Sequence, residues 1–469
     1  MPKNYVKNKK YASIYKAERK QKGTASESIT KTPTWRHLLK FALPTMLSMI
    51  IMSTFGIVDG IFVSRLIDPI ALAPVTVVFP FLAFAMSIGL MLGVGGNAMI
   101  AKKIGEGKTE EARRNFSLIV LVAVAVSVVI MIFGLLFPDI ILDILGADYM
   151  IRDMARDYLQ PLMWFLPTTV LGMVFQQFLI TAGKAHYGTY TATFGGIISA
   201  GLNFVFIQFM GMGIRGAAMA TNIGYILPAV VGLIYFAVAP RSNNLFFVMP
   251  KWDIRALGRT CINGASEMVT MLSVSITAVL MMNVLLNLGG AEAQAAAGIM
   301  FASMGIFSSL FIGYAAGVMP IISYNYGKND ITGLKMAYSN SLRIIAILSA
   351  VALGLILLSI NFMIGIYGIP AGTTMHSMAT TGLIFLASSF IFSGFNSFGS
   401  MFFTALNNGV VSSLLSFFRT LVFVVIAFLT LPVIFGLNGA WAAFPAAEVM
   451  SIFVTFALFK VMKKRYHYS

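Results

Sequence analysis

The chain has 469 residues, of which 58% are hydrophobic and 11% are charged, and its formal net charge is +16. Soluble domains carry about 25% charged residues, so too few polar side chains are present here to cover a surface in water. The composition excludes a cytosolic enzyme, a disordered chain and a nucleic-acid-binding module, and it predicts an all-α integral membrane protein. The single cysteine, Cys261, excludes a disulfide framework and any metal site built from several cysteines.

In chain order, the sequence begins with a polar, basic segment at residues 1–34. This segment contains no apolar run, so we expect a cytoplasmic arm and no secretory signal peptide. A bilayer core of about 30 Å requires about 20 apolar residues per helix, and this measure predicts twelve spans. They are 41–64, 70–101, 115–137, 158–182, 189–209, 214–239, 262–287, 293–323, 344–360, 379–405, 409–435 and 437–459.

The positions of the lysines and arginines predict the orientation and the domain organisation. With the N-terminus in the cytoplasm, 28 of the 33 basic residues fall in cytoplasmic segments, so both termini are predicted to be cytoplasmic. Residues 240–261 are polar and basic and are predicted to form a cytoplasmic linker. The linker separates an N-terminal lobe, 35–239, from a C-terminal lobe, 262–460, and residues 461–469 form a cytoplasmic tail.

The second half of the sequence repeats the first at an offset of 222 or 223 residues. Gly213 corresponds to Gly436 at the larger offset, and Gly95 corresponds to Gly317 at the smaller one. Each repeat holds six predicted spans, an even number, so both repeats insert in the same direction. We therefore expect two six-helix lobes related by an axis along the membrane normal, with a cavity between them.

Two glycine motifs suggest a nucleotide site, and neither has the required context. Gly107-Lys108-Thr109 is similar to the end of a phosphate-binding loop, but Lys102 occupies the position of the first glycine of such a loop, and no strand precedes it. The G-x-G-x-x-G pattern that begins at Gly211 lies between two membrane helices instead of after a strand. We therefore predict no cofactor and no enzymatic activity.

Three acidic residues and one basic residue lie inside the predicted spans, namely Asp59, Glu267, Glu448 and Arg419. A charge in the middle of a bilayer costs at least about 2.5–3.5 kcal/mol, so such a residue usually faces a cavity or a partner. Asp59 lies near the outer end of the first span, where desolvation favours the protonated carboxyl and makes proton uptake near neutral pH feasible. The alternative is an interfacial aspartate in contact with headgroup water.

Glu267 and the charges of the last two spans each have two interpretations. Glu267 lies five or six residues inside the seventh span, either as a coupling carboxylate or as a charge at the start of the helix. Arg419 and Glu448 both lie roughly 15 Å deep, so we expect an ion pair between the last two helices. Such a pair is either a structural lock or a contact that protonation opens, and loss of one partner leaves an uncompensated charge.

Six amides and one tyrosine inside the spans are candidates for lining a wet cavity that binds substrate. Each is alternatively a hydrogen-bonding group between packed helices. The 30 methionines and 39 phenylalanines suit a cavity that adapts to varied substrates. The seven candidates are Gln176, Gln177, Asn203, Asn222, Tyr324, Asn325 and Asn396.

Short motifs follow one another in a specific order over about residues 36–460. In the first lobe they are Phe41-Ala42-Leu43-Pro44, Val58-Asp59-Gly60, Gly93-Val94-Gly95-Gly96-Asn97, Thr181-Ala182-Gly183-Lys184, Leu202-Asn203 and Gly213-Ile214-Arg215-Gly216-Ala217-Ala218. In the second lobe they are Val318-Met319-Pro320, Tyr324-Asn325-Tyr326-Gly327 and Ala446-Ala447-Glu448. In this order, the motifs resemble those of the multidrug and toxic compound extrusion (MATE) family, in its bacterial multidrug efflux branch.

This resemblance implies a V-shaped bundle of two lobes that exports drugs or organic cations by alternating access, coupled to a cation. It implies that Asp59 is the first-span acid used for coupling, that Asn203 is a polar residue of the same lobe, and that Glu267 is the seventh-span acid. Members with a well-defined sodium site add an aspartate in the tenth span. Residues 379–405 contain no acid, which favours H⁺ over Na⁺ as the coupling ion.

The predicted function is therefore a secondary active multidrug efflux antiporter of the plasma membrane that exchanges lipophilic organic cations for H⁺ and acts as a monomer. Its expected partners are small-molecule organic cations or drugs and the surrounding membrane lipids, with no nucleic acid. Two alternatives are kept. A lipid-linked oligosaccharide flippase would carry a strongly cationic cavity for pyrophosphate, and a non-transporting membrane sensor or scaffold would not require intramembrane acids.

Overall fold

The computed structural model describes residues 29–67, 72–146, 149–240, 243–367 and 369–468. Most of the basic arm predicted at residues 1–34 lies outside these ranges. Inside the helices, the description does not include the side chains at positions 56, 57, 59–65, 72, 73, 76, 149, 150 and 291.

Every regular element of the described chain is a helix, as expected when lipid offers no partner to a backbone hydrogen-bonding group. The first half contains α3 (Trp35–Leu66), α4 (Leu72–Gly105), α5 (Thr109–Leu136), α6 (Pro138–Ile144), α7 (Tyr149–Trp164), α8 (Leu166–Thr181), α9 (Ala185–Phe204), the π-helical turn η2 (Val205–Phe209) and α10 (Gly213–Val238). The second half contains α11 (Ile254–Gly327), α12 (Ile331–Ile366), α13 (Thr374–Ala405), α14 (Gly409–Phe417), the π-helical turn η3 (Phe418–Val422) and α15 (Phe423–Tyr466).

Two long helical segments each contain two membrane passes joined at a glycine. The break in α11 is at Gly290, with φ 65°, and the break in α15 is at Gly436, with φ 58°, a conformation that glycine adopts at little cost. Arg419 and Glu448 are in contact although 29 residues separate them. An unbroken helix would hold two such residues roughly 43 Å apart, so the chain reverses direction at Gly436.

The described chain contains ten helices long and apolar enough to cross a membrane, or eleven when a bent pair is counted as one span. Both counts treat the 58 residues Gly409–Tyr466 as one helix. The reversal at Gly436 divides this helix into two passes. Together with the bent pair, this gives the predicted twelve passes. The bent pair is α7 and α8, which the sequence predicted as one span at 158–182. They meet at 55° because Pro167, which has no amide hydrogen, begins a new helix.

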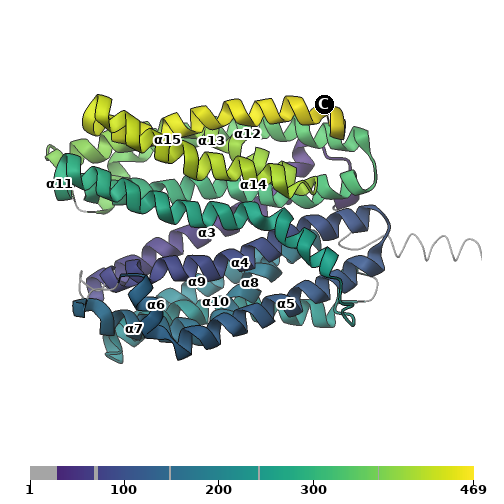
Figure 1. The fold of residues 1–469 in the computed structure, drawn as a ribbon, viewed down its shortest axis with the longest axis horizontal. Coiled ribbons are helices and arrows are strands. Elements are labelled where there is room, and N and C mark those ends of the chain that lie inside the picture. The colour runs from purple at the N-terminus through teal and green to yellow at the C-terminus, as the bar shows by residue number, and fades with distance from the viewer. Residues whose placement is uncertain (1–28, 68–71, 147–148, 241–242, 368, 469) are drawn as a thin grey trace, which may run out of the picture.

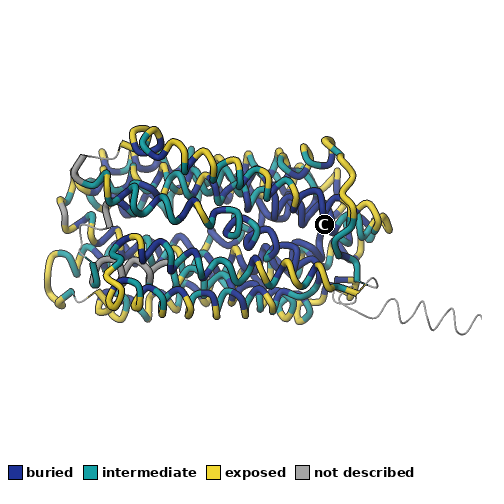
Figure 2. Tube along the Cα trace, turned by 90° about the horizontal axis from the view of Figure 1, so that it is seen from below, coloured by how far each residue is buried: buried dark blue, intermediate teal, exposed yellow. Residues whose placement is uncertain are grey.

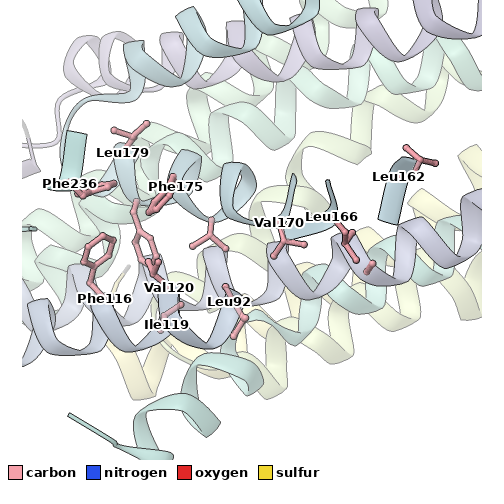
Figure 3. Close-up of a cluster of buried hydrophobic side chains, with 14 of the residues drawn as sticks. Leu92, Phe116, Ile119, Val120, Leu162, Leu166, Val170, Phe175, Leu179 and Phe236 are labelled. Atoms are coloured by element: carbon pink, nitrogen blue, oxygen red, sulfur yellow. The ribbon is translucent and has the colours of Figure 1, made fainter. Parts of the chain in front are cut away.

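The helices form two bundles that lie side by side (Figure 1). For description, α3 to α10 are the N-terminal lobe and α11 to α15 are the C-terminal lobe. Buried aromatic side chains fill the core of the N-terminal lobe. The ring of Phe236 lies 4.7 Å from that of Phe116 and 5.8 Å from that of Phe175 (Figure 3). Trp441 and Phe390 are fully buried in the separate core of the C-terminal lobe.

The two lobes pack closely at the end of the molecule where α4 and α11 end, which we call the basic end. A Cβ atom at Gly105 would overlap the carbonyl oxygen of Tyr324, and a Cβ atom at Gly327 would overlap that of Lys102. Gly105 and Lys102 correspond to Gly327 and Tyr324 at the 222-residue offset, so the two contacts are equivalent. The repeat therefore builds a nearly symmetrical seal between the lobes at this end.

The helix α11 begins at Ile254, eight residues earlier than the sequence predicted. The side chain of Asp253 accepts a hydrogen bond from the Ala256 N–H at 3.0 Å and caps this helix. Residues 254–261, which belong to the predicted linker, therefore form the first turns of this helix.

The outer surface of the described chain is apolar. Figure 2 shows the buried residues through the interior of the molecule and the exposed ones along its outer sides. Large hydrophobic side chains such as Phe209, Leu358 and Val433 are among the exposed ones. An exposed surface of this kind is expected where the helices face lipid.

Candidate functional site

The N-terminal lobe encloses a cavity of about 300 Å³ between α3, α4, α7, α8, α9 and α10. None of the described residues that line it is charged. Its volume lies at the lower end of the range of about 300–1,000 Å³ that is typical of small-molecule sites. The aromatic and methionine side chains of its wall are Met52, Phe55, Phe79, Met86, Tyr158, Met173 and Tyr225.

Three of the predicted polar candidates line this cavity. Gln176 is half-buried, and its Nε2 lies 3.5 Å from the sulfur of Met52. Asn203 is fully buried at the end of α9. Asn222 donates a hydrogen bond of 3.1 Å to the carbonyl of Pro161, in the last turn of α7, where helical carbonyls lack partners within the helix. The amide of Asn222 therefore also fixes the packing of α10 against α7.

The other polar candidates do not line the cavity. Gln177 is buried against α4, where a Cβ atom at Gly93 would lie 3.1 Å from its Cγ. Tyr324 and Asn325 lie at the basic end of α11, and Asn325 donates a 2.7 Å hydrogen bond to the carbonyl of Ile321. Gln177 is therefore packed against α4 with its side-chain oxygen unpartnered among the described residues, and the amide of Asn325 bonds to its own helix.

The predicted coupling acid Asp59 belongs to α3, but its side chain lies outside the described part of the structure. The neighbouring part of α3 is described, and Met52 and Phe55 of this helix line the cavity. Asp59 follows Phe55 by four residues and Met52 by seven.

In the C-terminal lobe, the structure brings the charges of the last two spans together. The guanidinium of Arg419 in η3 donates to both carboxylate oxygens of Glu448 in α15, with its Nη2 at 2.8 Å and its Nε at 3.1 Å. The two side chains are only 16% and 14% exposed. Arg419 also donates to the hydroxyl of Ser393 in α13 at 3.1 Å. Hydrogen bonds between two charged groups, as in this pair, are stronger than hydrogen bonds between neutral groups.

Asn396, one of the predicted cavity residues, instead completes this charge network. Its amide nitrogen donates to the Glu448 carboxylate at 2.6 Å and to the Glu448 backbone carbonyl at 3.0 Å. Its amide oxygen accepts a 2.7 Å hydrogen bond from the hydroxyl of Thr455. We call Ser393, Asn396, Arg419, Glu448 and Thr455 the charge network. Ser393 and Thr455 were not among the sequence candidates, because hydroxyls in membrane helices usually bond their own backbone.

Glu267 lies deeper in its helix than the sequence predicted. It follows the first residue of α11 by thirteen positions, which places it roughly 20 Å from the start of the helix. A helix terminus attracts charges only within its first turn, so the interpretation as a charge at the helix start does not apply. Within the described residues, no ion pair engages Glu267, whose side chain is half-buried.

The charge network and the cavity occupy equivalent positions in the two repeats. Three residues of the network have counterparts 223 positions earlier, and all three counterparts line the cavity. The pairs are Gly196 and Arg419, Tyr225 and Glu448, and Met173 and Asn396. Subtracting the repeat offset from the positions of the intramembrane charges therefore gives residues of the cavity wall. This signal is present in the sequence.

Twelve passes in two related lobes, with a cavity among the helices of one lobe, define a membrane transport protein of the duplicated type. The profile of the MatE family matches residues 44–206 and 267–429, two stretches that begin 223 positions apart. The chain therefore belongs to the MATE family of transporters. This membership confirms the family predicted from the motifs and a transporter rather than an enzyme.

The chain is similar to curated multidrug export proteins over most of its length. It is 22% identical over 432 residues to the multidrug export protein MepA of Staphylococcus aureus (strain MRSA252), covering 90% of this chain and 93% of the relative. MepA of Staphylococcus haemolyticus (strain JCSC1435) is 23% identical over 443 residues, with 92% and 94% covered.

Solved structures share the fold of the chain. A multidrug resistance MATE family transporter of the MOP superfamily, in an outward-facing conformation, superposes with a TM-score of 0.88. It is 21% identical in sequence, and 94% of this chain and 98% of that one are covered. This similarity shows the MATE fold, with its two repeats, for nearly the whole chain.

Proposed function

We propose that the chain is a multidrug exporter that binds lipophilic organic cations in the cavity of its N-terminal lobe. The observation that carries this proposal is the composition of the cavity wall, which combines aromatic rings and methionines with three amides. Aromatic faces attract organic cations, and methionines adapt to ligands of different shape. The relatives named multidrug export protein support the same substrate class.

The cavity also distinguishes this proposal from the oligosaccharide flippase. A pyrophosphate-linked substrate requires basic side chains, and none is present among the described residues of the wall. The intramembrane Arg419 is engaged by Glu448 in the other lobe. A cationic substrate needs no such basic group.

Antiport requires an acidic side chain that binds the coupling cation and the substrate in turn. Asp59 is the residue proposed for this role. It belongs to α3, the helix that contributes Met52 and Phe55 to the cavity wall. Glu267 is the second candidate, as a half-buried acid without an ion-pair partner among the described residues. The coupling ion proposed is H⁺, because α13 contains no acid that would complete a sodium site.

The proposed orientation places the basic end in the cytoplasm, following the distribution of lysine and arginine. The seal between the lobes at that end then corresponds to a state closed to the cytoplasm. Alternating access would open this seal and close the opposite end. The location proposed for the protein is the plasma membrane, with both termini cytoplasmic.

Proteoliposomes containing the purified chain test the proposal. We expect an imposed pH gradient to drive uptake of the fluorescent cation ethidium, and ethidium to drive proton flux. Asp59→Asn should abolish both fluxes, because an amide cannot exchange a proton. Asp143→Asn is the matched control, since this exposed aspartate is paired with Arg152 outside the cavity. Wild-type fluxes in Asp59→Asn would remove this residue from the mechanism, and no flux in the wild type would refute the function.

A further inference from the structure

A second cavity lies at the basic end, apart from the cavity of the N-terminal lobe. Its volume is about 660 Å³. The N-terminal lobe contributes the end of α4 and the start of α5, including Lys102 and Lys108. The C-terminal lobe contributes the first turns of α11 and the turn between α13 and α14, at Asn407 and Gly409. Both lobes thus contribute to this cavity. None of its lining residues also lines the cavity of the N-terminal lobe.

Basic side chains outnumber acidic ones in the wall of this cavity, by five to three. The acids are already engaged. Glu106 pairs with Lys108 at 3.0 Å, and Glu111 pairs with Lys103 at 3.1 Å. The third acid, Asp253, caps α11 through a hydrogen bond to its backbone. Among the described residues, no acid of the wall forms an ion pair with either arginine of the wall.

Arg255 and Arg259 are the two cations of the wall without a partner. Both are exposed, and within the described residues no hydrogen bond or ion pair engages either of them. They are four residues apart in the first two turns of α11, so they share one face of this helix. The N-terminus of a helix adds a partial positive charge at the same place. The electrostatic field of the cavity therefore favours an anion.

The geometry of a guanidinium indicates which anion fits. Arginine binds phosphate oxygens through two parallel hydrogen bonds, and two arginines on one helix face can hold one phosphate group. Asn263, which is buried in the same wall, has a side-chain oxygen without a hydrogen-bond partner among the described residues. The two guanidinium groups of the wall therefore fit a phosphate group, whether it is free or esterified.

An apolar surface borders the charged cavity. Ile262, three residues after Arg259, lines the cavity and is 56% exposed. The backbone of Gly409 packs against Ile262, because a Cβ atom at Gly409 would overlap the carbonyl oxygen of Ile262. The next residue, Val410, is 59% exposed. Acyl chains could therefore lie beside the phosphate site along the start of α14.

We propose that this cavity binds a phosphate group, carried by an anionic lipid headgroup or free in solution, between Arg255, Arg259 and the lysines of α4. A basic pocket between membrane helices is a common form of anionic lipid site. Because both lobes contribute to the wall, a bound phosphate favours the state in which the basic end is closed. This last consequence rests on the proposed alternating access, whereas the binding itself does not.

The test uses the full chain, purified in detergent and stripped of lipid. Native mass spectrometry measures binding of phosphatidylglycerol and of phosphatidylcholine, and titration calorimetry measures binding of inorganic phosphate. We expect saturable binding of phosphatidylglycerol in preference to phosphatidylcholine. In Arg255→Gln/Arg259→Gln the dissociation constant should rise about 30-fold, since each basic residue contributes about 1 kcal/mol near a lipid surface.

The control variant Lys463→Gln/Lys464→Gln removes the same charge from exposed positions at the end of α15, outside the cavity, and should bind as the wild type does. Arg255→Lys/Arg259→Lys keeps the charge and should retain more affinity than the glutamine variant, which separates binding from a folding defect.

The outcomes distinguish the two sources of the phosphate group. Preference for phosphatidylglycerol without binding of inorganic phosphate identifies the lipid as the source. Binding of inorganic phosphate that is lost in the glutamine variant identifies the free anion. Equal binding of both lipids with no phosphate binding, or equal affinity of the glutamine and control variants, overturns the proposal. Neither result depends on ethidium transport.

Discussion

The cavity of the N-terminal lobe and the charge network of the C-terminal lobe are two different uses of one repeated framework. Gly196 and Tyr225 line the cavity of the N-terminal lobe, whereas their counterparts Arg419 and Glu448 form an ion pair in the C-terminal lobe. The duplicated helices therefore fix where a site can form, and a few side chains decide whether the site is open or filled. Under the proposed function, this difference assigns cargo binding to one lobe and rigidity to the other.

The physical reason for the asymmetry is the cost of desolvation. A charge among membrane helices requires a partner or access to water, and a hydrogen-bonded ion pair is stable only while every member is present. The N-terminal cavity avoids this requirement, because its described wall is neutral and its amides bond to nearby groups. A neutral wall can accept and release a ligand without breaking an ion pair.

Removal of one partner of the ion pair tests this difference with the largest expected effect. Glu448→Ala should lower the free energy of unfolding by about 3–5 kcal/mol, because Arg419 then remains as an unpaired buried charge. Chemical denaturation in detergent micelles measures the change. Asp157→Ala is the control, since it breaks the exposed pair with Arg215 and should change the stability by less than about 1 kcal/mol.

The double variant Arg419→Met/Glu448→Leu sharpens the result. It removes both charges and keeps most of the volume, so it should recover at least half of the stability lost in Glu448→Ala. Stability of Glu448→Ala equal to that of the Asp157→Ala control would show that the network is not a lock. The ion pair of the C-terminal lobe would then not stabilise the protein, and the proposed difference in rigidity between the two lobes would be wrong.

The sequence predicted this pair because depth in a membrane helix follows from residue counting. The reversal at Gly436 brings the last two helices together, and Arg419 and Glu448 then lie at comparable depth. Counting also gave the order of the spans, since apolar runs of the right length are unambiguous in a chain of this composition. The helix α11 begins eight residues before the predicted span at 262–287, because a helix can continue into water when a residue such as Asp253 caps it.

The wall of the cavity was less predictable. The sequence offered seven polar candidates, and only Gln176, Asn203 and Asn222 line the cavity. Membrane helices are apolar on all faces, so the pattern of a helix does not show which face meets lipid, a neighbour or a cavity. Only the packing of the helices decides it, as Asn396 shows by joining the charge network instead.

The two asparagines provide the second test of the comparison. Asn396→Leu should destabilise the protein by about 1.5–3 kcal/mol, because it removes a hydrogen bond to the carboxylate of Glu448. Asn222→Leu should cost only about 0.5–1.5 kcal/mol, because its partner is the neutral carbonyl of Pro161. The same denaturation measurement serves both variants. A larger loss for Asn222→Leu would indicate that the N-terminal lobe, and not the charge network, depends on its polar contacts.

The last prediction concerns ligand binding alone and leaves the stability of the protein unchanged. Ala192 lines the cavity on α9, so Ala192→Trp should fill space that the cargo needs and weaken ethidium binding by about tenfold or more, which is 1.4 kcal/mol or more. Fluorescence titration of the purified protein measures the dissociation constant. Ile197→Trp is the matched control on the same helix, because Ile197 is exposed and does not line the cavity.

The pair of tryptophan variants separates the two lobes as binding sites. A specific loss in Ala192→Trp, with the control unchanged, would mean that the neutral cavity holds the cargo and that the charge network only supports the structure. Unchanged binding in Ala192→Trp would exclude the cavity of the N-terminal lobe as the cargo site. The cargo would then have to bind between the lobes or in the C-terminal lobe, where a charge network that opens on protonation becomes the better explanation of exchange.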